Sequence, residues 1–162
     1  MSVGVRLVLI SVAWVVIEVG SGYLTSRVPL RLFDHDGALT RARSWERGGE
    51  VYARLLRVHR WKDALPEAGA MFAGGFAKRG LATRSAQHLE RFIAETRRAE
   101  LTHWLPVVLS LSFFVWNPPH VAAWMPIIGF LGNLPFIVVQ RYVRPRLERL
   151  RARRRRAHGR RA

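Results

Sequence analysis

Hydrophobic residues in this chain are gathered into three long blocks instead of being spread evenly among polar ones. The blocks run from about residue 3 to residue 24, from Leu101 to Trp116 and from Val121 to Val139. A soluble globular protein interleaves apolar and polar positions, because each amphipathic helix needs one face in water. Blocks of about 16 to 22 residues instead match a hydrocarbon core of roughly 30 Å at about 1.5 Å per residue. The pattern therefore predicts an all-α membrane protein with about three transmembrane helices.

The first block contains only two charged residues, Arg6 and Glu18. A cleaved signal peptide is the alternative interpretation, since small residues follow at positions 20–22. A signal peptide favours a charged start and a short apolar core, whereas this block is long and begins nearly neutral. We therefore expect residues 1–25 to form an N-terminal transmembrane helix.

A polar region, residues 26–100, separates the first block from the second. It carries 15 Lys and Arg against nine Asp and Glu, which gives a net charge of +6. Four of its apolar residues recur at helical spacing: Val51, Leu55, Val58 and Leu65. With Trp61 as an interfacial aromatic, they predict a helix over 51–65 that lies on the membrane surface or packs on the protein's own core. Pro66 and Gly69 are expected to end this helix.

A second helical pattern begins at Ala86 and leads without a break into the second block. Its stripe consists of Leu89, Phe92, Ile93, Thr96 and Ala99. The turn sequence Asn117-Pro118-Pro119-His120 then separates the second block from the third. Since such a turn reverses the chain, we expect residues 101–140 to form a transmembrane helical hairpin.

The C-terminal tail, residues 141–162, holds 11 Arg and a single acid, Glu148, and so has a charge of +10. In a chain of net charge +16, such a tail could bind nucleic acid or anionic lipid, and the hydrophobic blocks decide for lipid. Basic segments tend to stay in the cytoplasm. We therefore expect a multi-pass cell-membrane protein whose region 26–100 and tail are cytoplasmic, with the N terminus and the hairpin turn outside.

Several classes of catalytic site are excluded by the sequence. The chain has no cysteine, so it has no disulfide, thiolate nucleophile or cysteine-ligated metal. It also lacks a Gly-x-Ser-x-Gly motif, a Walker loop, a dinucleotide fingerprint and a His/Asp metal box.

Three polar clusters flank the predicted hairpin, and the first lies at the start of its first helix. Thr96, Glu100 and His103 share one helical face through spacings of four and three. A histidine one turn from a carboxylate can act as a general base with its orienting partner. Spacing alone favours the alternative, an ion-paired helix end with His103 and Trp104 as interface anchors.

The second cluster lies in and after the third block. Asn133, Gln140 and Arg144 fall near one helical face at spacings of seven and four, with Arg141 beside them. An amide deep in a span needs a partner, so Asn133 could join two helices or present its amide to a hydroxyl or oxyanion. The third cluster consists of Trp61-Lys62-Asp63 together with Pro66-Glu67.

Three ordered motifs give the sequence a resemblance to a known family. They are W-K-D-A-L-P-E-A-G from Trp61 to Gly69, E-T-R-R-A-E-L-T-H-W from Glu95 to Trp104, and N-L-P-F-I-V-V-Q-R-Y-V-R-P-R-L from Asn133 to Leu147. Over residues 61–147 the chain resembles the bacterial glycosyl-4,4'-diaponeurosporenoate acyltransferases. The first block and the Arg-rich tail lie outside the resemblance.

The resemblance implies a membrane enzyme of carotenoid biosynthesis that places a fatty acyl chain on the sugar of a glycosylated carotenoid. The implied partners are that carotenoid, a fatty acyl donor such as acyl-CoA, and membrane lipid. Neither nucleic acid, a metal nor a prosthetic cofactor is implied, and the oligomeric state stays open. The competing class is a non-enzymatic membrane scaffold or small integral subunit.

Acyl transfer to a sugar hydroxyl needs a base for the hydroxyl and donors for the oxyanion. We expect His103, oriented by Glu100, to be the base, with Asn133 as a third catalytic residue. The expected substrate-binding residues are the other polar members of the clusters: Glu95, Arg97, Arg98, Gln140, Arg141, Arg144, Trp61, Lys62 and Glu67. An antiparallel hairpin should bring Glu100 and His103 to the cytoplasmic membrane boundary. Asn133 and Arg141 should face them there.

Overall fold

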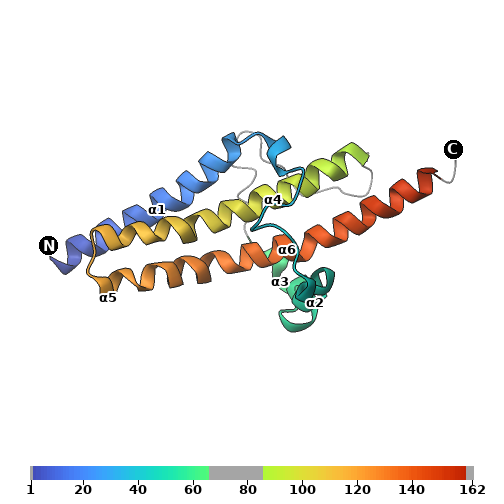
Figure 1. The fold of residues 1–162 in the computed structure, drawn as a ribbon. Coiled ribbons are helices and arrows are strands. Elements are labelled where there is room, and N and C mark those ends of the chain that lie inside the picture. The colour runs from blue at the N-terminus through green and yellow to red at the C-terminus, as the bar shows by residue number, and fades with distance from the viewer. Residues whose placement is uncertain (1, 66–85, 160–162) are drawn as a thin grey trace.

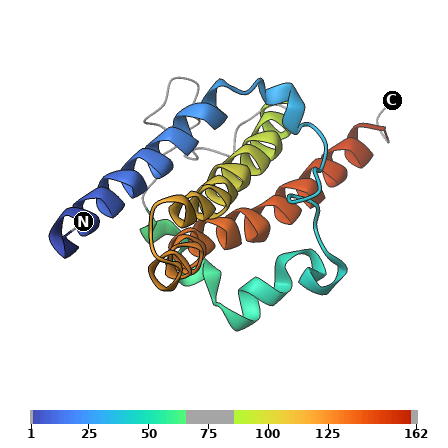
Figure 2. The same ribbon diagram turned by 60° about the vertical axis from the view of Figure 1, so that its left-hand side comes forward.

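Three long helices dominate the computed structural model, which describes residues 2–65 and 86–159. They are α1 (Val3–Arg27), α4 (Ala86–Leu109) and α6 (Trp124–Gly159). Figures 1 and 2 show α4 lying between α1 and α6, with α4 running opposite to both neighbours. Every regular element in the described residues is a helix, which confirms the all-α prediction.

Short helices connect the long ones. In chain order they are η1 (Leu30–Phe33), η2 (Ser44–Gly49), α2 (Glu50–Leu55), α3 (Val58–Trp61), η3 (Lys62–Ala64), η6 (Ser110–Val115) and α5 (Pro119–Ala122). The η elements are 3-10 helices. Figure 1 shows α2 and α3 on the side of α6 that faces away from α1.

The expected hairpin is formed by α4 and α6, which pack along each other. At the end of α4 the chain tightens into η6, and the Asn117 side chain donates a hydrogen bond to the Phe113 carbonyl at 3.2 Å. Prolines 118 and 119 then reverse the chain, because proline fixes φ and cannot continue the preceding helix. The turn therefore forms where the sequence predicted it.

The C-terminal half of the hairpin extends further than the apolar pattern indicated. Helix α6 continues through the Arg-rich tail to Gly159. Arginine is a good helix former, and Leu147 packs with Leu89, Phe92 and Ile93 of α4. This second hydrophobic contact holds the early part of the tail against α4, so the tail prolongs the helix.

The predicted helix over 51–65 is broken in the structure. Arg57 adopts a left-handed conformation with φ of 48° and separates α2 from α3. After this break Val58 is fully buried, together with Val138 and Val139 of α6. This segment therefore packs on the protein's own core, one of the two alternatives that the sequence left open. The predicted end of the helix at Pro66 and Gly69 lies outside the described residues.

Two segments are long and apolar enough to cross a membrane by length and composition: Val3–Arg27 and Pro119–Ala157. Helix α4 does not pass the same test, because its N-terminal half carries several charged residues. Its apolar half continues as η6, beside the apolar parts of α1 and α6 (Figure 1). Two of the three predicted spans thus have the composition of a span, and the third combines a charged half with an apolar one.

Close contact between α1 and the hairpin occurs at Gly129. The Trp14 ring packs against Phe113, with ring centroids 5.4 Å apart, and a Cβ atom on Gly129 would lie 2.7 Å from Trp14 Cη2. Since Trp14 is already packed, only a residue without a side chain lets α1 approach α6 this closely.

We expect Gly129→Ala to destabilise the protein by roughly 1 to 3 kcal/mol, because overpacking forces neighbouring side chains apart. The matched control is Gly132→Ala in the same helix, where the new methyl group meets no atom within 4 Å. This change should stabilise the helix by about 0.5 to 1 kcal/mol through helix propensity. Thermal unfolding in detergent micelles, followed by circular dichroism, measures both; equal shifts would contradict the close contact.

Candidate functional site

A fully buried carboxylate, Glu100, joins the two helices of the hairpin. Its exposed fraction is 0%. Arg141 of α6 donates from Nε to Glu100 Oε1 at 2.7 Å, and Arg144 donates to Oε2. Trp104, one turn along α4, also approaches Oε1 at 3.4 Å. The acid expected to orient His103 therefore has both oxygens occupied by guanidinium groups.

The two arginines also hold the segment before α2 against α6. Arg141 pairs with Glu46 of η2 at 2.5 Å and donates to the Leu39 carbonyl. Arg144 donates to Thr96 Oγ1 at 3.0 Å and to the Thr40 carbonyl. Burial and the neighbouring Glu46 raise the pKa of Tyr52 in α2 to about 12, so that its hydroxyl is protonated at neutral pH. The network therefore ties residues 39–52 to the hairpin.

Arg97 extends this network along α4. Its guanidinium contacts Asp36 at 2.7 Å and Glu148 at 3.1 Å, and it donates to the Phe33 carbonyl at 3.1 Å. Only 5% of Arg97 is exposed. A buried guanidinium with so many acceptors is fully satisfied. Arg97 therefore connects α4, α6 and the loop after η1.

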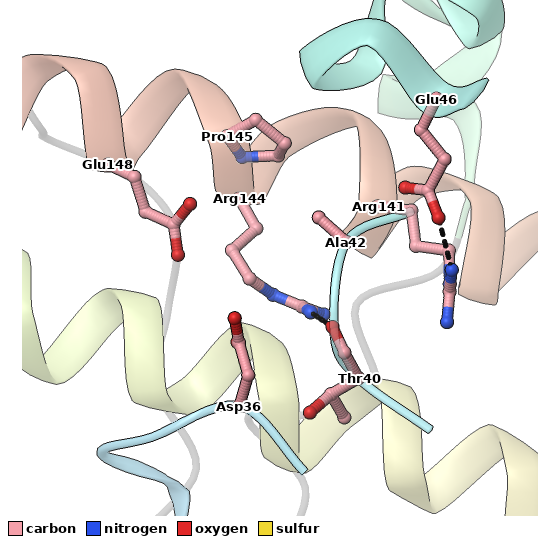
Figure 3. Close-up of a pocket in the computed structure, with 8 residues that line it drawn as sticks. All are labelled: Asp36, Thr40, Ala42, Glu46, Arg141, Arg144, Pro145 and Glu148. Carbon is pink, nitrogen blue, oxygen red and sulfur yellow. Dashed lines mark hydrogen bonds and ion pairs between the residues drawn. The ribbon is translucent and has the colours of Figure 1, made fainter. Parts of the chain in front are cut away.

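Figure 3 shows the small pocket that this network surrounds, with Arg141 and Arg144 reaching from α6 toward the segment that carries Thr40 and Glu46. Its enclosed volume is only about 10 Å³, room for about one water molecule, so the pocket is too small for an acyl chain or a carotenoid. Three arginines, at positions 97, 141 and 144, pair here with four carboxylates: Asp36, Glu46, Glu100 and Glu148. The excess of acids makes the pocket a poor phosphate site.

A second polar centre lies one helical turn further along α4, at His103. The distance from His103 Nδ1 to Asn133 Oδ1 is 2.8 Å. Asn133 Nδ2 donates to Glu18 Oε1 at 2.9 Å and to the Gly129 carbonyl at 3.0 Å. The imidazole also stacks on Phe136, with ring centroids 4.5 Å apart. Three helices therefore contribute to this centre.

The hydrogen bonds of Asn133 determine which nitrogen of His103 carries the proton. Because both N–H groups of the amide donate to other acceptors, its oxygen faces the imidazole as an acceptor. Nδ1 of His103 is then the donor, and Nε2 of the neutral ring keeps its lone pair. A histidine held in this way can accept a proton at Nε2.

The hairpin brings the two predicted clusters face to face. Glu100 meets Arg141 and Arg144, and His103 meets Asn133. The network gives Glu100 a structural role, because its carboxylate binds two buried guanidinium groups and, with Glu46, balances their charge.

The remaining predicted residues have other surroundings. Glu95 pairs with Arg98 at 2.7 Å, and burial raises the pKa of Glu95 above its ordinary value. Gln140 is buried within α6. Trp61 packs near Val138 and donates to the Leu56 carbonyl at 2.8 Å, while Lys62 contacts Asp63. Glu67 lies outside the described residues.

Sequence reasoning missed Glu18 as a site residue. A single carboxylate within an apolar block was the available signal, because an ionisable group is costly there unless it is paired or functional. Ser21 and Thr25 are buried and follow Glu18 at spacings of three and four, so they lie on the same face of α1. Thr25 Oγ1 lies 2.7 Å from Thr102 Oγ1 of α4. A polar stripe at helical spacing thus marked the inward face of α1.

We expect Glu100→Ala to lower the free energy of unfolding by about 3 to 5 kcal/mol, because the buried Arg144 loses its carboxylate partner and Arg141 keeps only Glu46. The matched control is Glu90→Ala, which removes another α4 glutamate that pairs with an α6 arginine, Arg155, at 2.5 Å. Both partners are exposed there, so the loss should be about 1 kcal/mol or less. Denaturation in micelles compares the two, and similar losses would refute the structural role.

Comparison with known proteins gives one consistent family. The sequence model of glycosyl-4,4'-diaponeurosporenoate acyltransferase matches residues 31–153. A protein of that name from Staphylococcus haemolyticus (strain JCSC1435) is 32% identical over 138 residues, 85% of this chain and 80% of the relative. Another from Staphylococcus aureus (strain MRSA252) is 30% identical over 141 residues, 86% and 84% of the two chains.

No solved structure matches this chain significantly. The family match nevertheless covers most of the sequence and includes the residues that α4 and α6 contribute to the two polar centres. The chain therefore belongs to the glycosyl-4,4'-diaponeurosporenoate acyltransferase family and is an acyltransferase.

Proposed function

We propose that this protein is a membrane enzyme that esterifies the sugar of a glycosylated carotenoid with a fatty acyl chain. The acceptor class follows from the name that its relatives carry. The observation that carries the proposal is the 2.8 Å contact between His103 Nδ1 and Asn133 Oδ1, because it leaves Nε2 as the base that such a transfer needs. Family membership favours this enzyme over a non-enzymatic scaffold.

The distribution of side chains on α1 supports a membrane location. Its buried residues are Ser21 and Thr25, which are polar. Its exposed residues are largely apolar, for example Val3, Leu7 and Val15 at 73%, 60% and 63%. A helix in water would have the reverse distribution, whereas lipid tails are a suitable environment for outward valines and leucines.

The order of the helices supports three crossings. Figure 1 shows the N terminus and α5 at one end of the bundle, and the basic end of α6 at the other. The apolar half of α4 lies between the apolar parts of α1 and α6. With the basic end on the cytoplasmic side, the ion-pair network around Glu100 would lie near the headgroups, with His103 one turn deeper. That depth suits an acceptor whose sugar is polar and whose carotenoid is apolar.

The proposed reaction is a direct acyl transfer. His103 Nε2 takes the proton of a sugar hydroxyl, and the hydroxyl oxygen attacks the carbonyl carbon of the acyl donor. The resulting oxyanion collapses, the bond to the leaving group breaks, and the imidazolium returns its proton to that group. With an acyl-CoA donor the leaving group is a thiolate. The chain has no cysteine and no serine motif, which favours one step over an acyl-enzyme intermediate.

Within this proposal Asn133 positions the base. Its two N–H groups are engaged by Glu18 and the Gly129 carbonyl, so the amide has no donor left for an oxyanion. The reaction as proposed needs no metal or prosthetic group, and the acyl donor is a co-substrate.

We expect His103→Ala to lower the yield of acylated pigment by at least about 100-fold, since general base catalysis contributes 10²- to 10⁴-fold. The measurement is pigment mass spectrometry in a host that makes the glycosylated carotenoid, normalised to the amount of membrane-inserted protein. His120→Ala is the control, because His120 is an exposed histidine in α5 at the turn. An unchanged ester yield in the His103 variant would refute its role as the base.

Topology can be tested separately. Reporter fusions ending at Gly48 and after Ala162 should both be cytoplasmic, because both follow basic segments. A reporter in the turn at 117–120 should be external. A cytoplasmic turn would rule out the three-span arrangement, even if the acyltransferase activity were present.

A further inference from the structure

Helix α1 carries one carboxylate, Glu18, which is linked to the proposed base by the amide of Asn133. Glu18 Oε1 accepts from Asn133 Nδ2 at 2.9 Å, and Asn133 Oδ1 lies 2.8 Å from His103 Nδ1. The three side chains come from α1, α6 and α4 in turn. They form a continuous hydrogen-bonded chain from a carboxylate to an imidazole.

The direction of these hydrogen bonds suits the stabilisation of an imidazolium. The amide of Asn133 directs its N–H group toward Glu18 and its carbonyl oxygen toward His103. A negative charge at Glu18 polarises the amide so that its oxygen becomes a better acceptor. That oxygen interacts most strongly with Nδ1–H when the ring is positively charged, which is the state reached during proton transfer.

Other charges close to His103 are already compensated. Glu100 on α4 is neutralised by Arg141 and Arg144 on α6. In the part of the chain that the structure describes, Glu18 forms no ion pair, and it is the only acid of α1. Its charge therefore acts on the amide and the imidazole without a counter-charge from these neighbours.

A role in packing alone does not explain the charge of Glu18, because a carboxylate at a lipid-facing position is energetically unfavourable. The residue is exposed on α1, beside outward-facing valines. In a membrane that surface meets lipid, where an ionisable group is rare unless it has a function. A serine or glutamine could bind Asn133 and hold α1 in place without the charge. The carboxylate is therefore better explained by what it does to the amide.

We propose that Glu18 is a positioning residue that acts on His103 through Asn133, so that α1 forms part of the catalytic centre. This inference depends on the proposed role of His103 as the base. It assigns a function to a residue that lies before the family match, which begins at residue 31.

The test compares Glu18→Gln with wild type in membranes, using acyl-CoA and the glycosylated carotenoid as substrates. Glutamine keeps an oxygen that can accept from Asn133, so α1 should stay in place. We expect kcat to fall about 10-fold or more while KM for the carotenoid changes less than about twofold. The acidic limb of the pH–rate profile should move to lower pH, because the imidazolium loses a stabilising charge. This midpoint does not depend on the amount of folded protein.

Ser11→Ala is the matched control on α1. Its hydroxyl is exposed and, within residues 2–65 and 86–159, donates to the Leu7 carbonyl of its own helix at 3.0 Å and to no other group, so this variant should behave as wild type. The double variant Glu18→Gln, His103→Ala should be no slower than His103→Ala, because residues acting as one unit are not additive.

The outcomes separate the two proposals. Wild-type kcat and an unchanged pH midpoint in Glu18→Gln, with an inactive His103→Ala enzyme, would overturn the role of Glu18 and leave the proposed function intact. A fully active His103→Ala enzyme would overturn both.

Discussion

The arrangement of the molecule depends on one buried carboxylate and the two guanidinium groups that bind it. Glu100 has no exposed surface and contacts both Arg141 and Arg144. Either arginine alone would leave a buried charge uncompensated at a cost of several kcal/mol. Together they fix the register of α4 against α6 and hold the segment at Glu46 beside them. The position of His103 opposite Asn133 follows from that register.

The polar residues of the hairpin form two groups, an ion-pair network and a candidate catalytic centre, and this explains why its polar motifs are long. The residues nearest the basic end of α6 form ion pairs with one another. Those one turn further along α4 form the candidate catalytic centre. The charged network holds α4 and α6 together, and rigidity matters because a base must be held within a fraction of an ångström of its proton. The ion pairs therefore contribute to chemistry by positioning groups that they do not touch.

Local pattern was enough to predict the helical class and the hairpin turn. An antiparallel hairpin also placed Glu100 and His103 opposite Asn133 and Arg141, but the pattern did not show which of them would pair. The local pattern could not predict features that depend on residues distant in sequence or on an unusual backbone conformation. Nothing in the spacing showed that Arg57 would adopt a positive φ, since arginine rarely does so. An Arg run fits both a solvated tail and a helix, and the contact of Leu147 with α4 decides for the helix. The partner of Glu18 is remote in sequence, so no local pattern could identify it.

The bond between Glu18 and Asn133 has a consequence for biosynthesis. Its two ends are 115 residues apart, so the first helix is made long before its partner exists. If α1 enters the bilayer on emergence, its carboxylate must be protonated or hydrated until the last helix inserts, because a bare charge in hydrocarbon is costly. Glu18 can bind Asn133 only after α6 has been synthesised, so the hydrogen-bonded chain from α1 to His103 is completed late in synthesis.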